Sequence, residues 1–126
     1  MTDQCECGSG FDYPGCCGRL IEQGEPAETA EQLMRSRYTA FVRMNRQYLL
    51  ESWHPATRPS GIEFDIRQRW LGLKIRQTIN GSASDRSGIV EFVAQFKING
   101  KASRLHETSY FERLHDRWHY HSGEFS

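Results

Sequence analysis

The four cysteines of this chain are gathered near one end of it. They form two close pairs, Cys5 with Cys7 and Cys16 with Cys17, and the rest of the 126-residue chain contains none. A disulfide framework would spread its cysteines through the fold, because longer closed loops give more stabilisation. Two close pairs joined by a short loop can instead bring four thiolates to one tetrahedral ion. The spacing therefore predicts a metal-binding segment that is too short to build its own core.

Three interpretations of this segment differ in what the sulfurs bind. We favour one structural Zn²⁺ per chain, held by Cys5, Cys7, Cys16 and Cys17, because the glycines of residues 8–15 allow the tight turns that such a site needs. A disulfide is the second interpretation, and bonding between the adjacent Cys16 and Cys17 would be strained. An iron–sulfur cluster is the third, although its usual spacings differ. Four protein ligands leave no open position on the ion, so we assign no catalytic residue.

The cysteine pairs lie within a characteristic sequence pattern. Cys5-Glu6-Cys7-Gly8-Ser9-Gly10, followed by Cys16-Cys17-Gly18, resembles the SEC-C motif, the small zinc-binding tail of the SecA preprotein translocase. That tail is associated with SecB and ribosome binding, so the resemblance implies a macromolecular partner. The SecA-type loop usually carries lysines, whereas residues 1–18 here contain Asp3, Glu6 and Asp12 and no basic side chain. With a formal net charge of zero for the whole chain, this argues against nucleic acid as the partner.

The loop between the cysteine pairs also carries apolar side chains. Phe11, Tyr13 and Pro14 lie there, and we expect them to form an exposed contact for a partner protein with a basic or neutral surface. Residues 19–26 contain Gly24 and Pro26 without periodicity and are predicted to be a linker. We therefore expect the cysteine segment to contribute little to the core of the rest of the chain.

The remainder predicts helices followed by strands. Thr29-Ala30-Glu31-Gln32 is a capping-box pattern that predicts a helix reaching about Asn45, and a second helix over Arg46–Trp53 ends before His54-Pro55. Leu71, Leu73, Ile75 and Ile79 alternate with polar residues, as in a half-buried strand. The other predicted strands cover residues 89–98, 101–111 and 118–121, with a hairpin turn at Asn99-Gly100. Helices followed by an antiparallel sheet define the α+β class.

Several short sequence segments extend the resemblance over nearly the whole chain. Arg35-Ser36-Arg37-Tyr38 and Trp53-His54-Pro55 are the most specific of them, and the chain resembles the YchJ-like family of small bacterial proteins. The resemblance implies a SEC-C module, here residues 1–20, followed by an NTF2-like domain, here residues 27–126. It further implies two helices packed on a curved antiparallel sheet as a cone with a cavity. It implies no activity, because the family is biochemically uncharacterised.

The hairpin register identifies candidate pocket residues. A two-residue turn at Asn99-Gly100 places Glu107 opposite Phe92 on the apolar face of the sheet, where an unpaired carboxylate is costly. We expect a buried ion pair between Glu107 and Arg37, and the alternative is a pocket acid with Tyr38 and Trp53 nearby. On the other face His106 and Glu91 form a dyad or a solvated pair, and His119 with His121 lacks a clear third ligand for a second metal site.

Two functions remain open from the sequence. The leading hypothesis is a non-enzymatic zinc-binding protein that interacts with a partner protein, and the alternative is a small-molecule binder or enzyme that uses the NTF2-like cavity. A cavity above about 300 Å³ with convergent polar groups would favour the alternative. No apolar run is long enough to cross a membrane, and Met1 to Gly10 do not resemble a signal peptide, so we expect a cytoplasmic protein.

Overall fold

The computed structural model of the chain describes residues 4–126, so Asp3, counted above among the acidic residues, lies outside the described residues. In chain order the elements are a 3₁₀ turn η1 (Tyr13–Gly15), α1 (Cys17–Ile21), α2 (Ala30–Val42), α3 (Arg46–Glu51), β1 (Gln68–Asn80), β2 (Ser87–Ile98), β3 (Lys101–Leu114) and β4 (Arg117–Phe125). The sheet has the order β1-β2-β3-β4 and is antiparallel throughout. The predicted α+β class is therefore confirmed.

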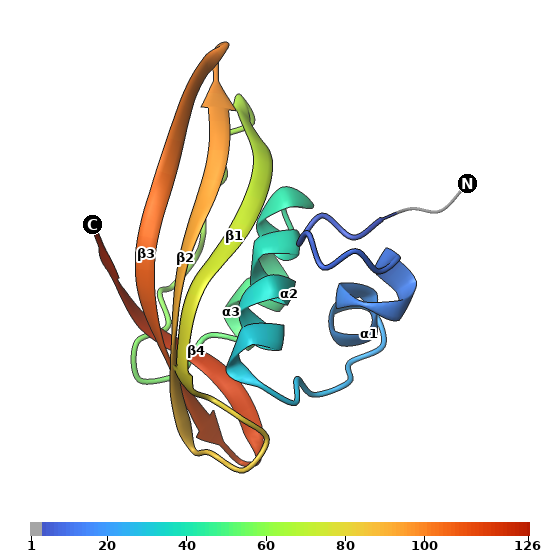
Figure 1. Cartoon of the computed structure of the whole chain (residues 1–126), viewed down its shortest axis with the longest axis vertical. Coiled ribbons are helices and arrows are strands. Elements are labelled where there is room, and N and C mark those ends of the chain that lie inside the picture. The colour runs from blue at the N-terminus through green and yellow to red at the C-terminus, as the bar shows by residue number, and fades with distance from the viewer. Residues whose placement is uncertain (1–3) are drawn as a thin grey trace.

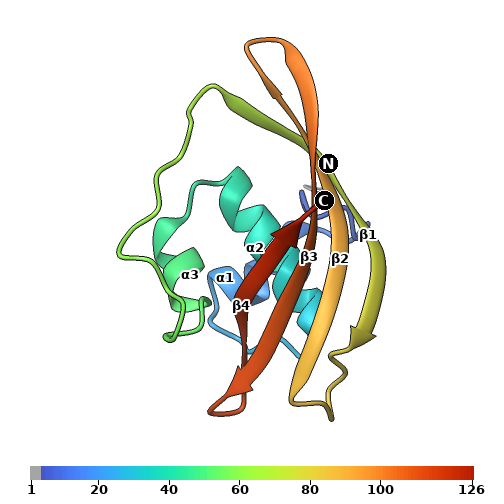
Figure 2. The ribbon, with the colours of Figure 1, turned by 90° about the vertical axis from the view of Figure 1, so that its left-hand side faces the viewer.

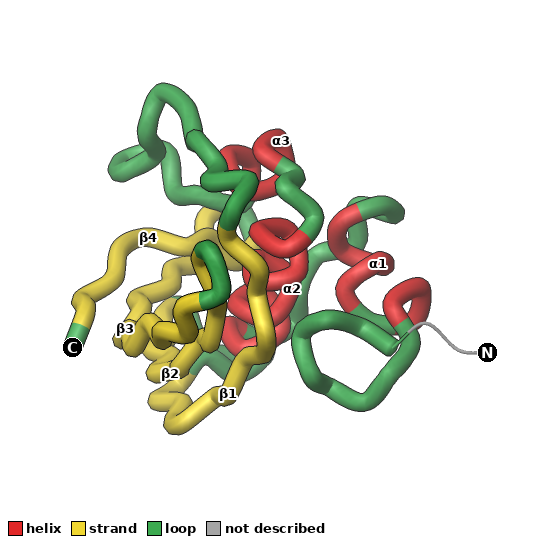
Figure 3. Tube along the Cα trace, turned by 90° about the horizontal axis from the view of Figure 1, so that it is seen from above, coloured by secondary structure: helices red, strands yellow, loops and turns green. Residues whose placement is uncertain are grey.

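The elements lie in three layers with α2 in the middle. The sheet covers one side of α2, and α1 with the cysteine segment covers the other, an arrangement visible from the front and from above (Figures 1 and 3). The long connection from α3 to β1, residues 52–67, runs beside the helices before it enters the sheet (Figure 2). None of the helices in the described part of the chain is long and apolar enough to cross a membrane.

Polar side chains close the N-terminal ends of α2 and α3. Thr29 accepts a hydrogen bond from the backbone N–H of Gln32 at 3.1 Å, as the capping pattern predicts. Asn45 does the same for α3, accepting from the N–H of Tyr48 at 3.0 Å. Because α2 is covered on two sides, even its small polar residues Ser36 and Thr39 are fully buried. This central position lets one helix organise both of the candidate sites described below.

The helix α1 corrects the prediction for residues 19–26. We expected a linker there, but Arg19 to Ile21 are helical and Leu20 is buried. The helix has only five residues, so its sequence shows no periodicity, and packing rather than propensity stabilises it. Cys5, Cys7, Cys17 and Leu20 belong to the same apolar core as the α2 residues Leu33 and Tyr38. The expectation that the cysteine segment adds little to the core is therefore wrong.

The register of the central hairpin agrees with the prediction. Phe92 faces Glu107 across β2 and β3, and Ile98 faces Lys101 next to the turn. Asn99 and Gly100 have φ angles of 52° and 80°, the left-handed values of a two-residue hairpin turn. The inner face of the sheet therefore carries the residues predicted for it.

The strand β1 departs from the simple alternation that its sequence predicts. Its register against β2 shifts between Trp70 and Gly72 and again between Ile75 and Gln77. These bulges leave Trp70, Leu73 and Ile75 packed against the core, whereas Leu71 and Ile79 are exposed. The prediction that Leu71 and Ile79 share the buried face is wrong, because each inserted residue reverses the side to which the next one points.

Candidate metal centre and ligand cavity

The four cysteine thiols converge on one point. Their sulfur atoms all lie within 4.8 Å of one another, and none takes part in a disulfide. A tetrahedral ion with Zn–S bonds of about 2.3 Å has sulfur–sulfur edges of about 3.8 Å. The Sγ atoms of Cys7 and Cys16 are 3.6 Å apart, close to that edge. The donor set therefore fits a tetrahedral metal ion without rearrangement of the backbone.

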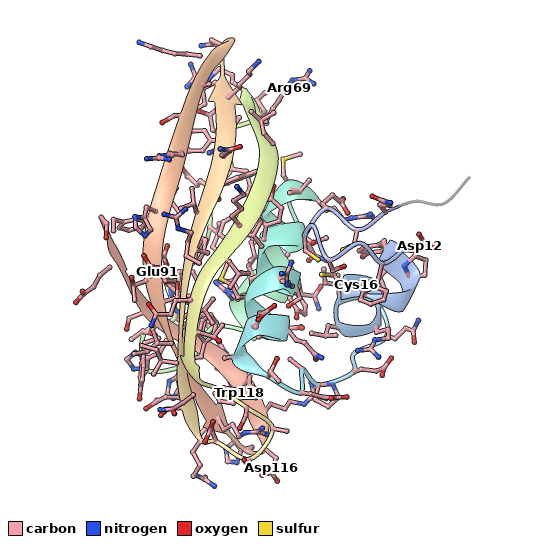
Figure 4. All side chains as sticks on the ribbon, in the orientation of Figure 1. Asp12, Cys16, Arg69, Glu91, Asp116 and Trp118 are labelled. Atoms are coloured by element: carbon pink, nitrogen blue, oxygen red, sulfur yellow. The ribbon has the colours of Figure 1, made fainter. Side chains whose placement is uncertain are left out.

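Local backbone geometry brings the two cysteine pairs together. Gly8 and Gly10 adopt φ angles of 79° and 90°, which side-chain-bearing residues rarely adopt. The backbone N–H of Cys5 donates to the carbonyl of Phe11 at 2.8 Å, which closes the loop. Cys16 follows η1 and Cys17 begins α1, so the second pair stands where two short helical turns meet. Cys16 lies on the side of α2 away from the sheet (Figure 4).

Hydroxyl groups surround the sulfurs. Ser9 Oγ lies 3.1 Å from Cys16 Sγ, and Thr39 Oγ1 donates to Cys17 Sγ at 3.4 Å. Thr39 comes from α2 and is fully buried, and nothing in the sequence marked it as part of the site. Hydrogen bonds from the thiols of Cys17 and Cys5 lower the pKa of the Cys7 thiol. The pKa of Cys17 is raised, because its thiol donates hydrogen bonds to Cys5 and Cys7. Four thiolates in such a buried place require a cation among them.

Two arginines, one in α2 and one directly after its last residue, reach into the cysteine segment. Arg35 donates to the carbonyl of Cys7 at 2.7 Å, and Arg43 donates to both carboxylate oxygens of Glu6 at 2.9 and 3.2 Å. With Thr39 they are spaced four residues apart along α2, so all three lie on the helix face toward the cysteines. The segment that is purely acidic in sequence therefore has its basic partners on another element.

The three predicted partner-binding residues do not share one environment. Phe11 is 69% exposed and Pro14 is exposed, whereas Tyr13 is only 7% exposed. The Tyr13 ring lies 3.6 Å from the guanidinium carbon of Arg43, and an added carbon on Gly18 would come within 3.2 Å of it. Tyr13 is therefore packed inside the segment, and its prediction as an exposed contact is wrong.

The opposite face of α2 borders a cavity of about 390 Å³ between the helices and the sheet. All four predicted pocket residues line it, namely Arg37, Tyr38, Trp53 and Glu107. Its walls are mostly aromatic and aliphatic. They include the lining residues Met34, Phe41, Phe64, Trp70, Phe92, Leu105, Tyr120 and Phe125.

A carboxylate is held in place in this cavity. Glu107 is 7% exposed, and its Oε2 accepts hydrogen bonds from Ser109 Oγ at 2.5 Å and Tyr120 Oη at 3.1 Å. Gly123 lies directly beneath it, because a carbon added to Gly123 would come within 2.6 Å of the carboxylate carbon. Ser109, Tyr120 and Gly123 went unrecognised in the sequence. Register arithmetic places Ser109 on the Glu107 face, whereas the predicted last strand, residues 118–121, contains Tyr120 without a register against Glu107 and ends before Gly123.

Arg37 does not form the predicted ion pair with Glu107. One terminal nitrogen of its guanidinium donates to the carbonyl of Leu49 at 2.8 Å and to Ser52 Oγ at 2.6 Å. Its guanidinium carbon lies 4.6 Å from the centre of the Tyr120 ring. Burial lowers the pKa of Arg37 to about 10, which still leaves it charged at neutral pH. Tyr120 lies between the two charged groups, because its hydroxyl donates to Glu107 and its ring packs against the Arg37 guanidinium.

Two further groups of polar side chains lie elsewhere on the fold. His106 Nε2 is 2.6 Å from Glu91 Oε2, and Glu91 lies on the face of the sheet away from the helices (Figure 4). His54, Glu112 and His121 bring three ligand atoms within 4.8 Å. The N–H of Ala56 donates to His54 Nδ1 at 3.0 Å, and His54 Nε2 lies 3.4 Å from Glu112 Oε2, so both ring nitrogens of His54 already face protein partners.

The fold and the cysteine cluster together define an NTF2-like domain that carries a SEC-C motif. A family model described as "YchJ, middle NTF2-like domain" matches residues 29–123. The chain belongs to this YchJ-like family.

Known relatives agree with this assignment. The chain is 46% identical to a UPF0225 protein of Chromobacterium violaceum over 94% of this chain and 90% of that one. It is also 46% identical to a UPF0225 protein of Streptomyces coelicolor, over 98% and 97% of the two chains. A solution structure of a SEC-C motif containing protein from Rhodopseudomonas palustris matches with a TM-score of 0.83 and 32% identity, covering 98% of both chains. A crystal structure of a sec-c motif containing protein from Psychrobacter arcticus matches with a TM-score of 0.73 and 27% identity, over 100% and 83%.

Proposed function

We propose that the protein binds a small molecule in the cavity between α2 and the sheet. The observation that supports this most is the cavity itself, whose volume of about 390 Å³ exceeds the roughly 300 Å³ at which ligand pockets begin. Ligand cavities of this kind combine apolar walls with a few fixed polar groups. Here the walls are aromatic, and Glu107 with its two hydroxyl partners is the fixed polar group. The proposal is for binding and assigns no reaction.

We further propose that the metal of the cysteine cluster is one structural Zn²⁺ per chain. A closed set of four thiolates suits zinc and leaves no position for substrate. The ion would hold the cysteine segment against Thr39 and Arg35, and so fix the position of α2. Because α2 also forms a wall of the cavity, the metal would support the binding site from behind. Thiolates kept for a metal are typical of a reducing compartment, which supports a cytoplasmic location.

The proposal is tested by filling the cavity. Ala94 is buried and lines it, whereas Gln95, the next residue of β2, is exposed. Fragments of mixed charge are screened by protein-observed NMR, and we expect shifts at cavity residues that Ala94→Phe abolishes and Gln95→Phe preserves. If no fragment changes the chemical shifts of cavity residues in the wild-type protein, the proposal is refuted. This readout does not depend on how well Ala94→Phe folds.

A partner protein at the cysteine segment is the second candidate function. The favouring observation is the exposed Phe11 ring beside a groove of about 470 Å³ that Arg19 and Arg35 also line. Phe11 and Pro14 would supply the apolar contact. We expect Phe11→Ala to abolish capture of a cytosolic partner, whereas Ile79→Ala, which removes another exposed apolar group from the sheet, should leave capture unchanged. Equal capture by both variants would exclude this surface.

A further inference from the structure

We propose that the ligand of the cavity is a small organic cation, an amine with an aromatic or compact alkyl body whose ammonium group binds Glu107. This inference rests on the proposed binding function and adds the charge and chemical class of the ligand. It depends on four features of the cavity: the unused oxygen of Glu107, the burial and hydrogen bonding of Arg37, the charges of the lining residues, and the aromatic walls.

The carboxylate of Glu107 has one oxygen to spare. Both hydrogen bonds that it accepts within residues 4–126 reach Oε2, from Ser109 and from Tyr120. Oε1 accepts none, and no basic side chain of the described residues lies within ion-pairing distance of the carboxylate. An ionised carboxylate is purely an acceptor, and one removed from water needs a donor or a counter-charge. A ligand ammonium supplies both at the same atom.

Arg37, the arginine among the described residues that line the cavity, is engaged through one terminal nitrogen of its guanidinium. Arg37 donates to Leu49 and Ser52, and its guanidinium carbon lies 5.0 Å from the Trp53 ring centre and 4.6 Å from that of Tyr120. Aromatic rings next to the guanidinium stabilise its charge and limit access to it. Arg37 is also the more buried of the two charged residues, 3% exposed against 7% for Glu107, so it is less accessible to an anionic ligand than Glu107 is to a cationic one.

The charges of the lining residues point in the same direction. Three carboxylates line the cavity, those of Glu63, Asp65 and Glu107, against the single guanidinium of Arg37. Asp65 is neutralised by Arg67 at 2.9 Å. Glu63 is exposed, so solvent screens much of its charge, and the lining residues together carry a small excess of negative charge that favours a cation.

The walls fit the body of such a ligand. Trp70 packs edge-on against Tyr38 at 5.7 Å and lies 5.5 Å from Phe96, and Phe41 lies 6.2 Å from both Trp70 and Phe64. Aromatic faces attract cations and also bury apolar surface. Met44, Ile66 and Phe125 are exposed apolar residues that also line the cavity. The volume is near the lower end of the range for ligand pockets, so the ligand is small.

The charge class is tested with three probes that share one body. The probes are 2-phenylethylamine, 2-phenylethanol and phenylacetate, each titrated into the full-length zinc-loaded protein and followed by chemical shifts of cavity residues. At neutral pH they carry a positive, zero and negative charge. We expect the amine to bind roughly tenfold more tightly than the alcohol, since hydrogen bonds to charged groups are the stronger ones, and the acetate to bind most weakly.

Matched variants assign the effect to one carboxylate. Glu107→Gln keeps the shape and the acceptor for Tyr120, and it should reduce binding of the amine to that of the alcohol without changing the alcohol. Glu91→Gln makes the same change on the outer face and should alter neither.

The possible outcomes separate the two proposals. Equal binding of the three probes in the cavity, or tightest binding of phenylacetate, would overturn the charge class and leave the binding function standing. Shifts at no cavity residue with any probe would overturn both. The wild-type series alone decides between these results, so the test does not depend on the folding of Glu107→Gln.

Discussion

The carboxylate of Glu107 lies against the α-carbon of Gly123, the residue that β4 places beside Ser109 of β3. A methyl group on Gly123 would overlap the carboxylate and come within 2.9 Å of Tyr120 Oη. The absence of a side chain at this position therefore makes room for the acid in the cavity. The contact between Gly123 of β4 and Glu107 of β3 therefore connects two neighbouring strands at the candidate binding group.

Replacing Gly123 should consequently destabilise the protein. We predict that Gly123→Ala lowers the free energy of unfolding by about 1–3 kcal/mol, because the carboxylate must leave its two hydroxyl partners or the strands must separate. Denaturant unfolding measures this change. Gly61→Ala is the matched control, since an added carbon there meets nothing within 4 Å. Equal stability of the two variants would contradict the close contact.

The metal content follows from the cysteine cluster. We predict one zinc ion per chain in protein purified under reducing conditions, measured by elemental analysis. The double variant Cys7→Ser and Cys16→Ser should lose it, because two of four ligands are removed. His121→Ala should keep one ion, since His121 does not belong to the cysteine cluster. Zinc retained by the serine variant would refute the cysteine site.

Removing the metal should affect the whole fold and not only its first residues. The cysteines share a core with α2, so we predict that a strong chelator lowers the free energy of unfolding of the entire chain by at least ~2 kcal/mol. Thermal unfolding followed by circular dichroism, with and without chelator, measures this loss. An unchanged transition for the sheet after zinc removal would show that the two parts are independent.

The contact between Arg43 and Glu6 should be measurable as a coupling. The pair is partly exposed, with side chains 37% and 28% accessible, so we predict a coupling energy of only about 0.5–1 kcal/mol from a double-mutant cycle of Arg43→Met and Glu6→Gln. Raising the salt concentration should reduce it, because exposed charges are screened. A coupling near zero at low salt would contradict the contact.

Tyr48 should make stability depend on alkaline pH. Burial raises its pKa from 10 to about 12, so between pH 10 and 12 the folded protein holds a proton that the unfolded chain has released. Its contribution is therefore fully present below pH 10 and lost as pH rises to about 12. Arg37, whose pKa is lowered to about 10, works in the opposite direction, and comparing wild type with Tyr48→Phe cancels it.

The measurement is the free energy of unfolding at pH 9 and at pH 11. We expect the wild-type protein to lose more stability over this interval than Tyr48→Phe loses, by roughly 1 kcal/mol, since one pKa unit corresponds to about 1.4 kcal/mol. The hydroxyl of Tyr48 lies 2.6 Å from Ser36 Oγ, so Ser36→Ala serves as a control that removes this contact and keeps the titrating group. Parallel pH profiles for wild type and Tyr48→Phe would refute the shift.

The sequence alone determined the features that depend on neighbouring residues. Cys5 and Cys7, followed by Cys16 and Cys17, predicted one convergent cluster because a short glycine-containing loop restricts where the two pairs can lie. Thr29 predicted the start of α2 through one local hydrogen bond. Asn99-Gly100 set the register of β2 and β3, because a two-residue turn leaves one pairing, and that register placed Glu107 opposite Phe92.

Contacts between distant side chains depend on tertiary packing and could not be read from the sequence. Tyr13 is buried because Arg43, thirty residues further along, covers its ring. Arg37 bonds to α3 and packs on Tyr120 of β4 rather than pairing with Glu107, a choice that depends on how three elements pack. The bulges of β1 likewise arise from pairing with β2. Local rules act through steric limits and hydrogen bonds within a few residues, whereas these contacts are set by the competition of many side chains for the same buried space.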